Sequence, residues 1–194
     1  MTFDSFATLV VFAGVLVCTP GPANMLLMTA GANAGLRASF PLLAGVTLGK
    51  LFVHLCLALG LWQIIERFPT VLLVMKVAGA CYIVWLAWKV LHLKIKKGAM
   101  TAGFVAGLVV HPLNPKAWAM VASAYGQFID ADSGWWLQTF IIAVVFFFWQ
   151  CIAHTFWCWS GATAAHALGE RRQTQLMFVL SAAMVGAVLW SLAH

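Results

Sequence analysis

Five residues of this sequence can carry a positive charge or move a proton, although they stand deep in apolar stretches. They are Lys50, Lys116, His54, His111 and His154. A lysine near the centre of a bilayer costs about 2.5–3.5 kcal/mol on insertion scales, so it usually faces a protein interior or a water-filled cavity. Lysine ammonium groups bind anions, and histidines exchange protons near neutral pH. These residue types indicate an anion site, with the three histidines as candidates for a proton relay.

Each of these residues also has a purely structural interpretation. Snorkelling to an interface is the alternative for both lysines, and we favour binding for Lys116 while Lys50 stays balanced between the two. His54 lies one turn after Lys50 and shares its face. For His111 and His154 we favour a hydrogen bond to a neighbouring helix over a proton relay. No aspartate or glutamate lies deep in an apolar run, so we do not expect a carboxylate relay.

Prolines interrupt two of the apolar runs near their middles, in TPGPAN at 19–24 and in HPLNPK at 111–116. Proline removes a backbone donor and clashes with the preceding turn, so each break leaves two half-helices and unpaired carbonyls. The half-helices that restart bring partly positive N-termini into the protein, which suits an anion. The expected binding residues of this two-part pocket are Pro20, Gly21, Pro22, Asn24, Asn114, Pro115, Lys116 and Lys50.

The composition places these residues in a membrane. Of the 194 residues, 63% are hydrophobic and 8% are charged, which is too little charge for the surface of a soluble domain. Because lipid offers no partner for bare backbone groups, we expect an all-α integral membrane protein with six transmembrane helices in a single membrane domain over residues 1–194. Runs long enough to cross a bilayer cover residues 5–31, 39–62, 70–91, 100–125, 136–164 and 175–193.

The two breaks occupy matching positions in two halves of the chain, about 1–97 and 98–194. Pro22 and Pro115 are 93 residues apart, so each falls in the first helix of its half. With three spans in each half, the halves have opposite orientations, and we expect a 3+3 inverted repeat with spans 1 and 4 broken by prolines. In transporters built this way, paired interrupted helices mark the binding site.

The loop charges predict the orientation. Arginine and lysine concentrate in the first, third and fifth loops, so these loops are expected in the cytoplasm and both termini on the periplasmic side. This pattern also explains the net charge of +6, and we expect no nucleic-acid partner because the basic residues form no stripe with interleaved aromatics. The residues concerned are Arg37 in the first loop, Lys89, Lys94, Lys96 and Lys97 around the third, and Arg171 with Arg172 in the fifth.

Several short elements recur in a characteristic order: TPGPAN at 19–24, GLRASFPLLAGVTLG at 35–49, AGACYIVWLAWK at 78–89, NPKAW at 114–118 and QFI at 127–129. With this order and spacing the chain resembles the LysE/RhtB family of amino-acid exporters in bacterial inner membranes. The resemblance implies efflux of small amino acids or their derivatives, driven by the proton gradient and without a cofactor. It also implies that both breaks line the central site. Lys50 and His54 depart from the apolar pattern expected there, and an extra buried cation would favour a more acidic solute.

We therefore expect a secondary transporter and no enzyme, with a small amino-acid substrate and the lipid bilayer as its partners. In this interpretation the substrate carboxylate meets the two half-helix ends and Lys116, and the two repeats rock around it. The sequence leaves a homo-oligomer open.

Two other functions stay open at this stage. A membrane thiol-disulfide conduit would use Cys18 beside the first break, but the second break has no cysteine. A metal-ion exporter would use His54, His111 and His154, which lie on three spans without ligand spacing or deep carboxylates, and we expect no metal site. A purely structural membrane protein would not need two paired breaks.

Overall fold

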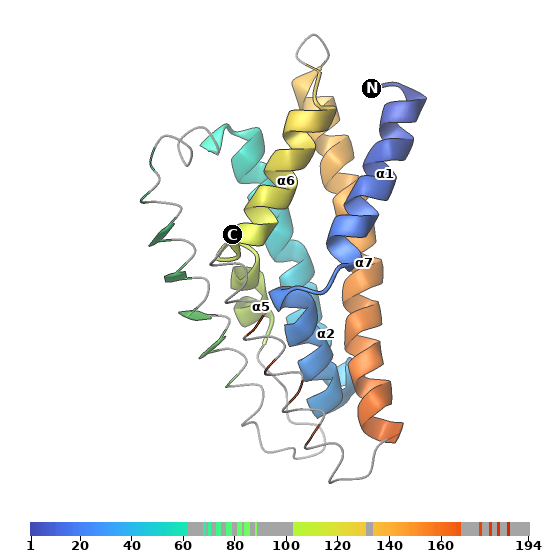
Figure 1. Cartoon of the computed structure of the whole chain (residues 1–194), viewed down its shortest axis with the longest axis vertical. Coiled ribbons are helices and arrows are strands. Elements are labelled where there is room, and N and C mark those ends of the chain that lie inside the picture. The colour runs from blue at the N-terminus through green and yellow to red at the C-terminus, as the bar shows by residue number, and fades with distance from the viewer. Residues whose placement is uncertain are drawn as a thin grey trace.

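The computed structural model of this chain describes three continuous stretches, residues 1–61, 103–130 and 134–167, with isolated residues at 68, 70, 73–74, 77–78, 81–82, 84–85, 88, 175, 179, 182 and 186. Every regular element in the three stretches is an α-helix (Figure 1), which confirms the all-α prediction there. Pro22–Ala58 and Trp135–Ala165 are long and apolar enough to cross a membrane, and Phe3–Cys18 is a shorter apolar helix. Most residues of the spans expected at 70–91 and 175–193 lie outside the described residues. The same holds for every basic loop residue except Arg37.

Helix α1 (Phe3–Cys18) leads into the first break, which comprises residues 19–21. Thr2 begins the helix by accepting a hydrogen bond from the backbone N–H of Ser5. After Cys18 the backbone is extended at Thr19 and at Gly21. Helix α2 (Pro22–Ala58) then begins at a proline, a residue that suits the first helical position because the N–H there has no helical acceptor anyway.

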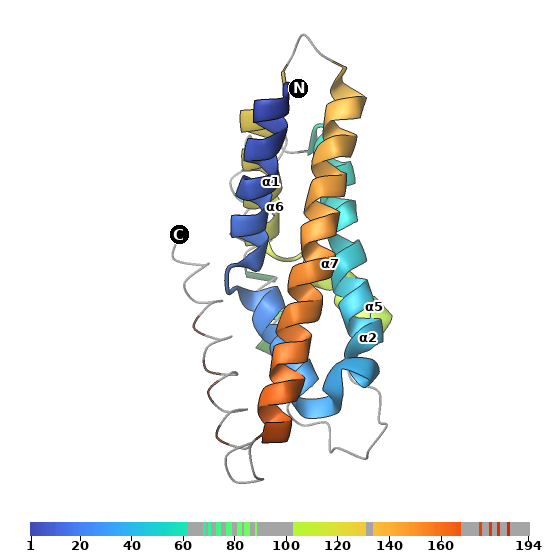
Figure 2. The same ribbon diagram turned by 90° about the vertical axis from the view of Figure 1, so that its right-hand side faces the viewer.

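Helix α2 consists of two arms that meet at Gly35, where φ is +79°. Residues 22–34 form the first arm and residues 36–58 the second, and the two run in opposite directions (Figure 2). Because glycine adopts positive φ without a steric cost, a single residue makes this reversal. We expected a loop between the runs 5–31 and 39–62. The chain does reverse there, but only Gly35 leaves the helical conformation, and Arg37 lies inside the second arm.

The second half of the chain contains another interrupted helix. Helix α5 (Phe104–Val110) ends at the second break, residues 111–114, and α6 (Pro115–Phe128) follows it. Helix α7 (Trp135–Ala167) then returns along the molecule. The α5–α6 segment runs in the direction opposite to α1 and the first arm (Figures 1 and 2).

Glycines let the second arm of α2 approach α5 closely. A Cβ atom on Gly45 would overlap the carbonyl oxygen of Phe104, and one on Gly49 would overlap the carbonyl oxygen of Leu108. From the other side, Gly107 faces the backbone of the second arm in the same way. Such contacts are typical of helix pairs in membranes, where small residues allow dense packing.

The first arm of α2 meets α7 through a second pair of glycines. A Cβ atom on Gly31 would overlap the carbonyl oxygen of Cys158, and one on Gly161 would overlap the carbonyl oxygen of Met28. Both arms of α2 are therefore fixed at backbone distance against a helix from the second half of the chain. These contacts hold the two breaks in the same region of the molecule.

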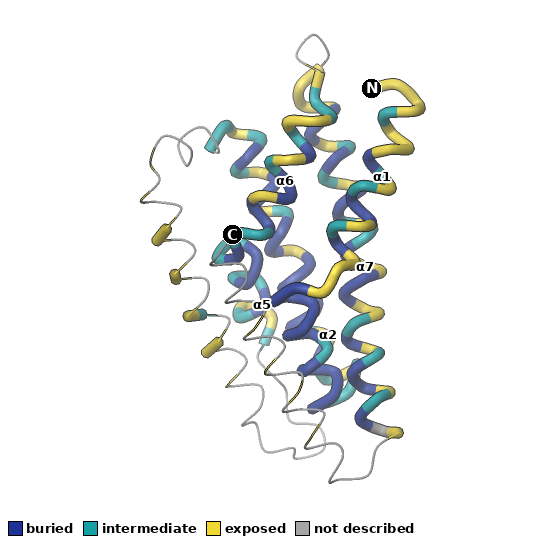
Figure 3. The backbone as a smooth tube through the Cα atoms, viewed as in Figure 1, coloured by how far each residue is buried: buried dark blue, intermediate teal, exposed yellow. Residues whose placement is uncertain are grey.

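Exposed positions recur along α7 (Figure 3), and many of them are large apolar residues. These residues recur about every fourth position, so each lies beside the next and the row winds gradually around the helix. They are Trp136, Phe140, Val144, Phe148, Ile152, Phe156 and Trp159. A continuous apolar face of this length is unfavourable in water and is suited to contact with lipid.

We predict that adding a methyl group at the α2–α7 crossing destabilises the protein. Gly31→Ala and Gly161→Ala should each lower the free energy of unfolding by about 1–3 kcal/mol, because the added carbon forces the backbones apart. Gly126→Ala is the matched control, since a Cβ there meets no atom within 4 Å. Thermal unfolding in detergent measures the difference, and equal melting temperatures for all three variants would contradict the packing described.

Candidate functional site

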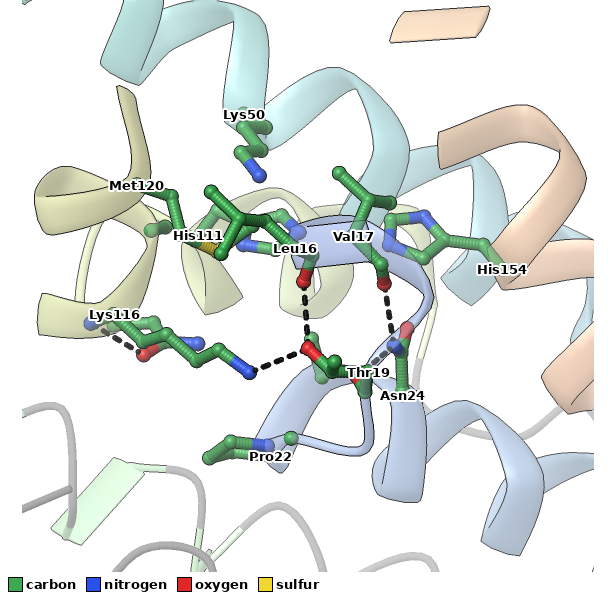
Figure 4. Close-up of a pocket in the computed structure, with 14 residues that line it drawn as sticks. Leu16, Val17, Thr19, Pro22, Asn24, Lys50, His111, Lys116, Met120 and His154 are labelled. Carbon is green, nitrogen blue, oxygen red and sulfur yellow. Dashed lines mark hydrogen bonds between the residues drawn. The ribbon is translucent and has the colours of Figure 1, made fainter. Parts of the chain in front are cut away.

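Lys116 connects the two breaks. It stands in the first turn of α6, and its side chain reaches across to the first break (Figure 4). The Nζ atom donates to Thr19 Oγ1 at 3.2 Å and to the carbonyl oxygen of Pro20 at 3.4 Å. A Cβ atom on Gly21 would lie 3.0 Å from the same nitrogen. The ammonium group therefore lies against the first break.

Every backbone carbonyl around the first break has a hydrogen-bond donor. In a membrane this accounting matters, because an unpaired carbonyl in hydrocarbon costs several kcal/mol. Six carbonyls, those of residues 16–21, are involved. In chain order their donors are Thr19 Oγ1, Asn24 Nδ2, Trp157 Nε1, Asn24 Nδ2 again, Lys116 Nζ and the N–H of Met25. Two of these donors, Trp157 and Lys116, come from the second half of the chain.

The two asparagines beside the breaks use opposite ends of their amide groups. Asn24 Nδ2 donates to the carbonyl oxygens of Val17 and Thr19, both at 2.9 Å. Asn114 instead accepts, through Oδ1, from the backbone N–H of Lys116 at 3.1 Å, and so it is the N-cap of α6. Both side chains are buried. Asn24 therefore binds carbonyl groups at the C-terminal end of α1, and Asn114 caps the N-terminus of α6.

A pocket lies between the two breaks (Figure 4). Its walls come from α1, both breaks, both arms of α2, α6 and α7. The interior leaves about 30 Å³ for the centres of water molecules, which is room for about two waters. The lining residues are Leu16, Val17, Thr19, Gly21, Pro22, Ala23, Asn24, Lys50, His111, Asn114, Lys116, Ala117, Met120 and His154.

The start of α2 presents uncapped N–H groups to this pocket. Gly21 is the N-cap and has no side chain to accept a hydrogen bond. The first N–H groups of a helix have no acceptor within the helix, and Ala23 and Asn24, which carry two of them, line the pocket. Together with Lys116 they form an environment that favours an anion.

Lys50 enters the same pocket from the second arm of α2. It is 1% exposed, and its Nζ atom lies 4.8 Å from the centroid of the Phe146 ring on α7. His54, one turn later, packs on the same ring at a centroid distance of 5.2 Å, as expected for residues that share a face. His54 is not among the residues that line the pocket.

His111 and His154 stack on each other, with ring centroids 5.6 Å apart and an angle of 20° between the planes. His154 Nδ1 forms a hydrogen bond with Thr47 Oγ1 at 2.9 Å, which confirms the bond to a neighbouring helix that we favoured. For His111 that expectation is wrong, because both of its ring nitrogens are buried without a partner among the described residues. The amide of Gln150 is also buried without a partner there.

The structure brings most of the expected binding residues together. Gly21, Pro22, Asn24, Asn114, Lys116 and Lys50 line one pocket with His111 and His154. Pro20 and Pro115 do not line it: Pro20 contributes its carbonyl to Lys116, and Pro115 is the first residue of α6. Sequence reasoning missed Thr19 and Thr47. The spacing of Thr47, Lys50 and His54 on one helix face was the signal that could have found Thr47.

The groupings required by the two other functions are not present among the described residues. All five cysteines are free thiols, and Cys18, which is exposed, has no partner cysteine at the second break. In the part of the chain that the structure describes, no three histidine, cysteine or carboxylate side chains are arranged to hold a metal ion.

Comparison with known proteins gives a family match over most of the chain. Residues 14–194 match the LysE type translocator family. The cysteine/O-acetylserine efflux protein of Escherichia coli (strain K12) is 32% identical over 118 residues, which are 59% of this chain and 60% of that protein. The protein of the same name from Klebsiella pneumoniae is 30% identical over 132 residues, 66% of this chain and 67% of that protein. The match thus spans about three fifths to two thirds of these relatives. No solved structure matches the chain.

We predict that aspartate is tolerated at position 114 and not at position 24. Asn114→Asp keeps the oxygen that caps α6 and should change the free energy of unfolding by less than about 0.5 kcal/mol. Asn24→Asp removes two donors and turns a carboxylate toward carbonyl oxygens, which should cost at least about 1–3 kcal/mol. Thermal unfolding in detergent gives the comparison. Equal losses for the two variants would show that the asparagines do not have these opposite roles.

Proposed function

The chain belongs to the LysE type translocator family, and we propose that it is a secondary transporter that exports a small amino acid or amino-acid derivative from the bacterial cytoplasm. The observation that carries this proposal is the pocket between two interrupted helices, with Lys116 reaching from one break to the other. The names of the relatives, which are cysteine/O-acetylserine efflux proteins, support the same substrate class.

We further propose that the chain crosses the inner membrane six times as a 3+3 inverted repeat. The segment formed by α1 and the first arm of α2 runs in the direction opposite to the α5–α6 segment (Figures 1 and 2). Each segment contains one break, and both observations support this arrangement. The basic loops in the sequence support cytoplasmic odd loops and periplasmic termini.

In the proposed mechanism the substrate carboxylate takes the place of the first break as the partner of Lys116. Among the described residues, the hydrogen-bond acceptors of the ammonium group are the neutral oxygens of Thr19 and Pro20, and a carboxylate would add the attraction of a full negative charge. The N–H groups at the start of α2 would bind the second carboxylate oxygen. The pocket has room for about two waters, so the α6 side and the first break must separate when the substrate enters.

Movement of the two breaks apart and together provides alternating access. The substrate would enter from the cytoplasm while the breaks are apart, and they would close again after release to the periplasm. Lys116 returns to Thr19 and Pro20 in the empty state, so the carbonyl of Pro20 regains its donor. Helices joined through glycine at backbone distance, such as α2 with α7, would move as rigid units around this site.

We propose that export is coupled to the proton gradient through the histidines of the pocket. None of the described residues lining the pocket is a carboxylate, which supports His111, His154, Lys50 or the substrate itself as the carrier of the proton. The stacked pair of His111 and His154, with Thr47 as the next hydrogen-bonding group, forms a short path away from the pocket. His54 lies outside the pocket on the Phe146 ring, and it would extend this path only after rearrangement.

Export should depend on Lys116. Cells that overproduce the protein should accumulate a specific amino acid in the medium, and Lys116→Ala should reduce this accumulation at least about tenfold, because a charge-assisted bond to the substrate is lost. Arg37→Gln, which removes an exposed cation at the start of the second arm, is the matched control and should export normally. A metabolite profile of the medium provides the measurement. Unchanged export by Lys116→Ala at equal protein levels would contradict the proposed site.

Coupling should depend on the stacked histidines. In proteoliposomes, a pH gradient should drive uptake or release by the unaltered protein, and addition of a protonophore should remove that effect. His111→Gln and His154→Gln should retain exchange of substrate across the membrane without a gradient, which needs no net proton movement. They should lose the acceleration by the gradient. If both variants still respond to the gradient, the histidines do not carry the proton.

A further inference from the structure

Among the described residues, two lysine side chains and no carboxylate line the pocket. Figure 4 shows Lys50 approaching from the second arm of α2 and Lys116 from α6, on opposite sides. The Lys116 nitrogen is bonded to neutral oxygens, and the nearest interaction of the Lys50 nitrogen is with the ring of Phe146. Neither ammonium group forms an ion pair within the part of the chain that the structure describes.

Near Lys50 the pocket also holds a buried group without a partner. His111 lines the pocket, is 6% exposed, and has no hydrogen bond at either ring nitrogen. A buried polar group without a partner costs about 1–3 kcal/mol, so such groups usually mark a place where water or a ligand completes the site. On the side of the pocket away from the first break, Lys50 therefore provides donors, and His111 provides one donor and, when neutral, one acceptor.

These donors do not suit the ammonium group of a zwitterion. A zwitterionic amino acid brings a cation together with its carboxylate, and the described lining of the pocket has no anion to receive that cation. Like charges within a few ångströms of each other repel, and the repulsion is stronger where burial lowers the local dielectric constant, as around Lys50. A substrate without a positive charge avoids this repulsion, and a substrate with a second carboxylate offsets it by attraction to the lysines.

We propose that the pocket selects amino acids or derivatives that carry a net negative charge, a choice that rests on the proposed export function and narrows its substrate class. The carboxylate binds Lys116 and the start of α2. The remaining polar part of the substrate faces Lys50 and His111. Such a solute can arise from a second acid group in the side chain or from acylation of the amine, because both give a small carboxylate with net charge of about −1 at neutral pH.

Two pairs of matched probes test this selectivity in proteoliposomes. N-acetyl-L-serine and O-acetyl-L-serine have the same atoms, but only the first is an anion without an ammonium group. L-aspartate and L-asparagine have nearly the same shape and differ by one negative charge. Each probe competes with a transported labelled substrate in mildly acidic buffer. In at least one pair the anionic probe should compete at a concentration about tenfold lower, or less, than its partner needs, and that pair identifies the source of the charge.

Lys50→Met provides the second arm of the experiment, because it keeps an unbranched apolar stem and removes the charge. The preference for the anion should fall to about twofold or less, while Arg37→Gln keeps the full preference. Lys50→Gln is a second variant. If neither variant folds, the comparison of N-acetyl-L-serine with O-acetyl-L-serine in the unaltered protein still tests the charge selectivity.

The outcomes separate this inference from the function on which it rests. Transport of zwitterions in preference to anions would overturn the charge selectivity and leave amino-acid export intact. A preference for anions that persists in Lys50→Met and Lys50→Gln would overturn the role of Lys50. Transport of none of the four probes, nor of any other amino acid, would overturn both proposals.

Discussion

The carbonyl oxygens of an interrupted helix must find donors inside the protein, and this requirement organises the whole site. Lipid supplies no donor, so the first break is stable only because side chains from elsewhere reach it. Lys116 and Trp157, both from the second half of the chain, donate to Pro20 and Cys18. The interruption of one helix is thus compensated by residues of distant segments, and the ammonium group that does this is also the group that we propose binds the substrate.

The close packing of α2 keeps this arrangement in place. Its two arms reverse at Gly35 and lie at backbone distance from α7 and α5, because Gly31, Gly161, Gly45 and Gly107 leave no side chain between the helices. The ends of the interrupted helices consequently meet in the middle of the structure. A substrate that draws Lys116 away from the first break removes a donor from Pro20, and the free energy of that exchange couples binding to the separation of the two breaks.

The sequence predicted the parts of the site that depend on local chemistry. Proline positions located both breaks, and the matched positions of TPGPAN and NPKAW gave a family resemblance that is confirmed over residues 14–194. Helical periodicity correctly placed Lys50 and His54 on one face. It could not show that only Lys50 reaches the pocket, because this depends on how α7 lies against α2. Likewise, the lack of a partner for His111 follows from its stacking on His154, a contact between segments that no local pattern specifies.

The central claim, that the two breaks meet at one pocket, can be tested by chemical cross-linking in membranes. In a variant whose five native cysteines are replaced by alanine, Gly21→Cys and Lys116→Cys would be treated with dibromobimane, which fluoresces strongly only after bridging two nearby thiols. A Cβ atom at position 21 lies 3.6 Å from the Cδ atom of Lys116, so the account predicts rapid bridging. The pair Gly126→Cys and Gly21→Cys, on distant parts of the molecule, should not react. Absence of a bridge between positions 21 and 116, or equal bridging by both pairs, would contradict the account.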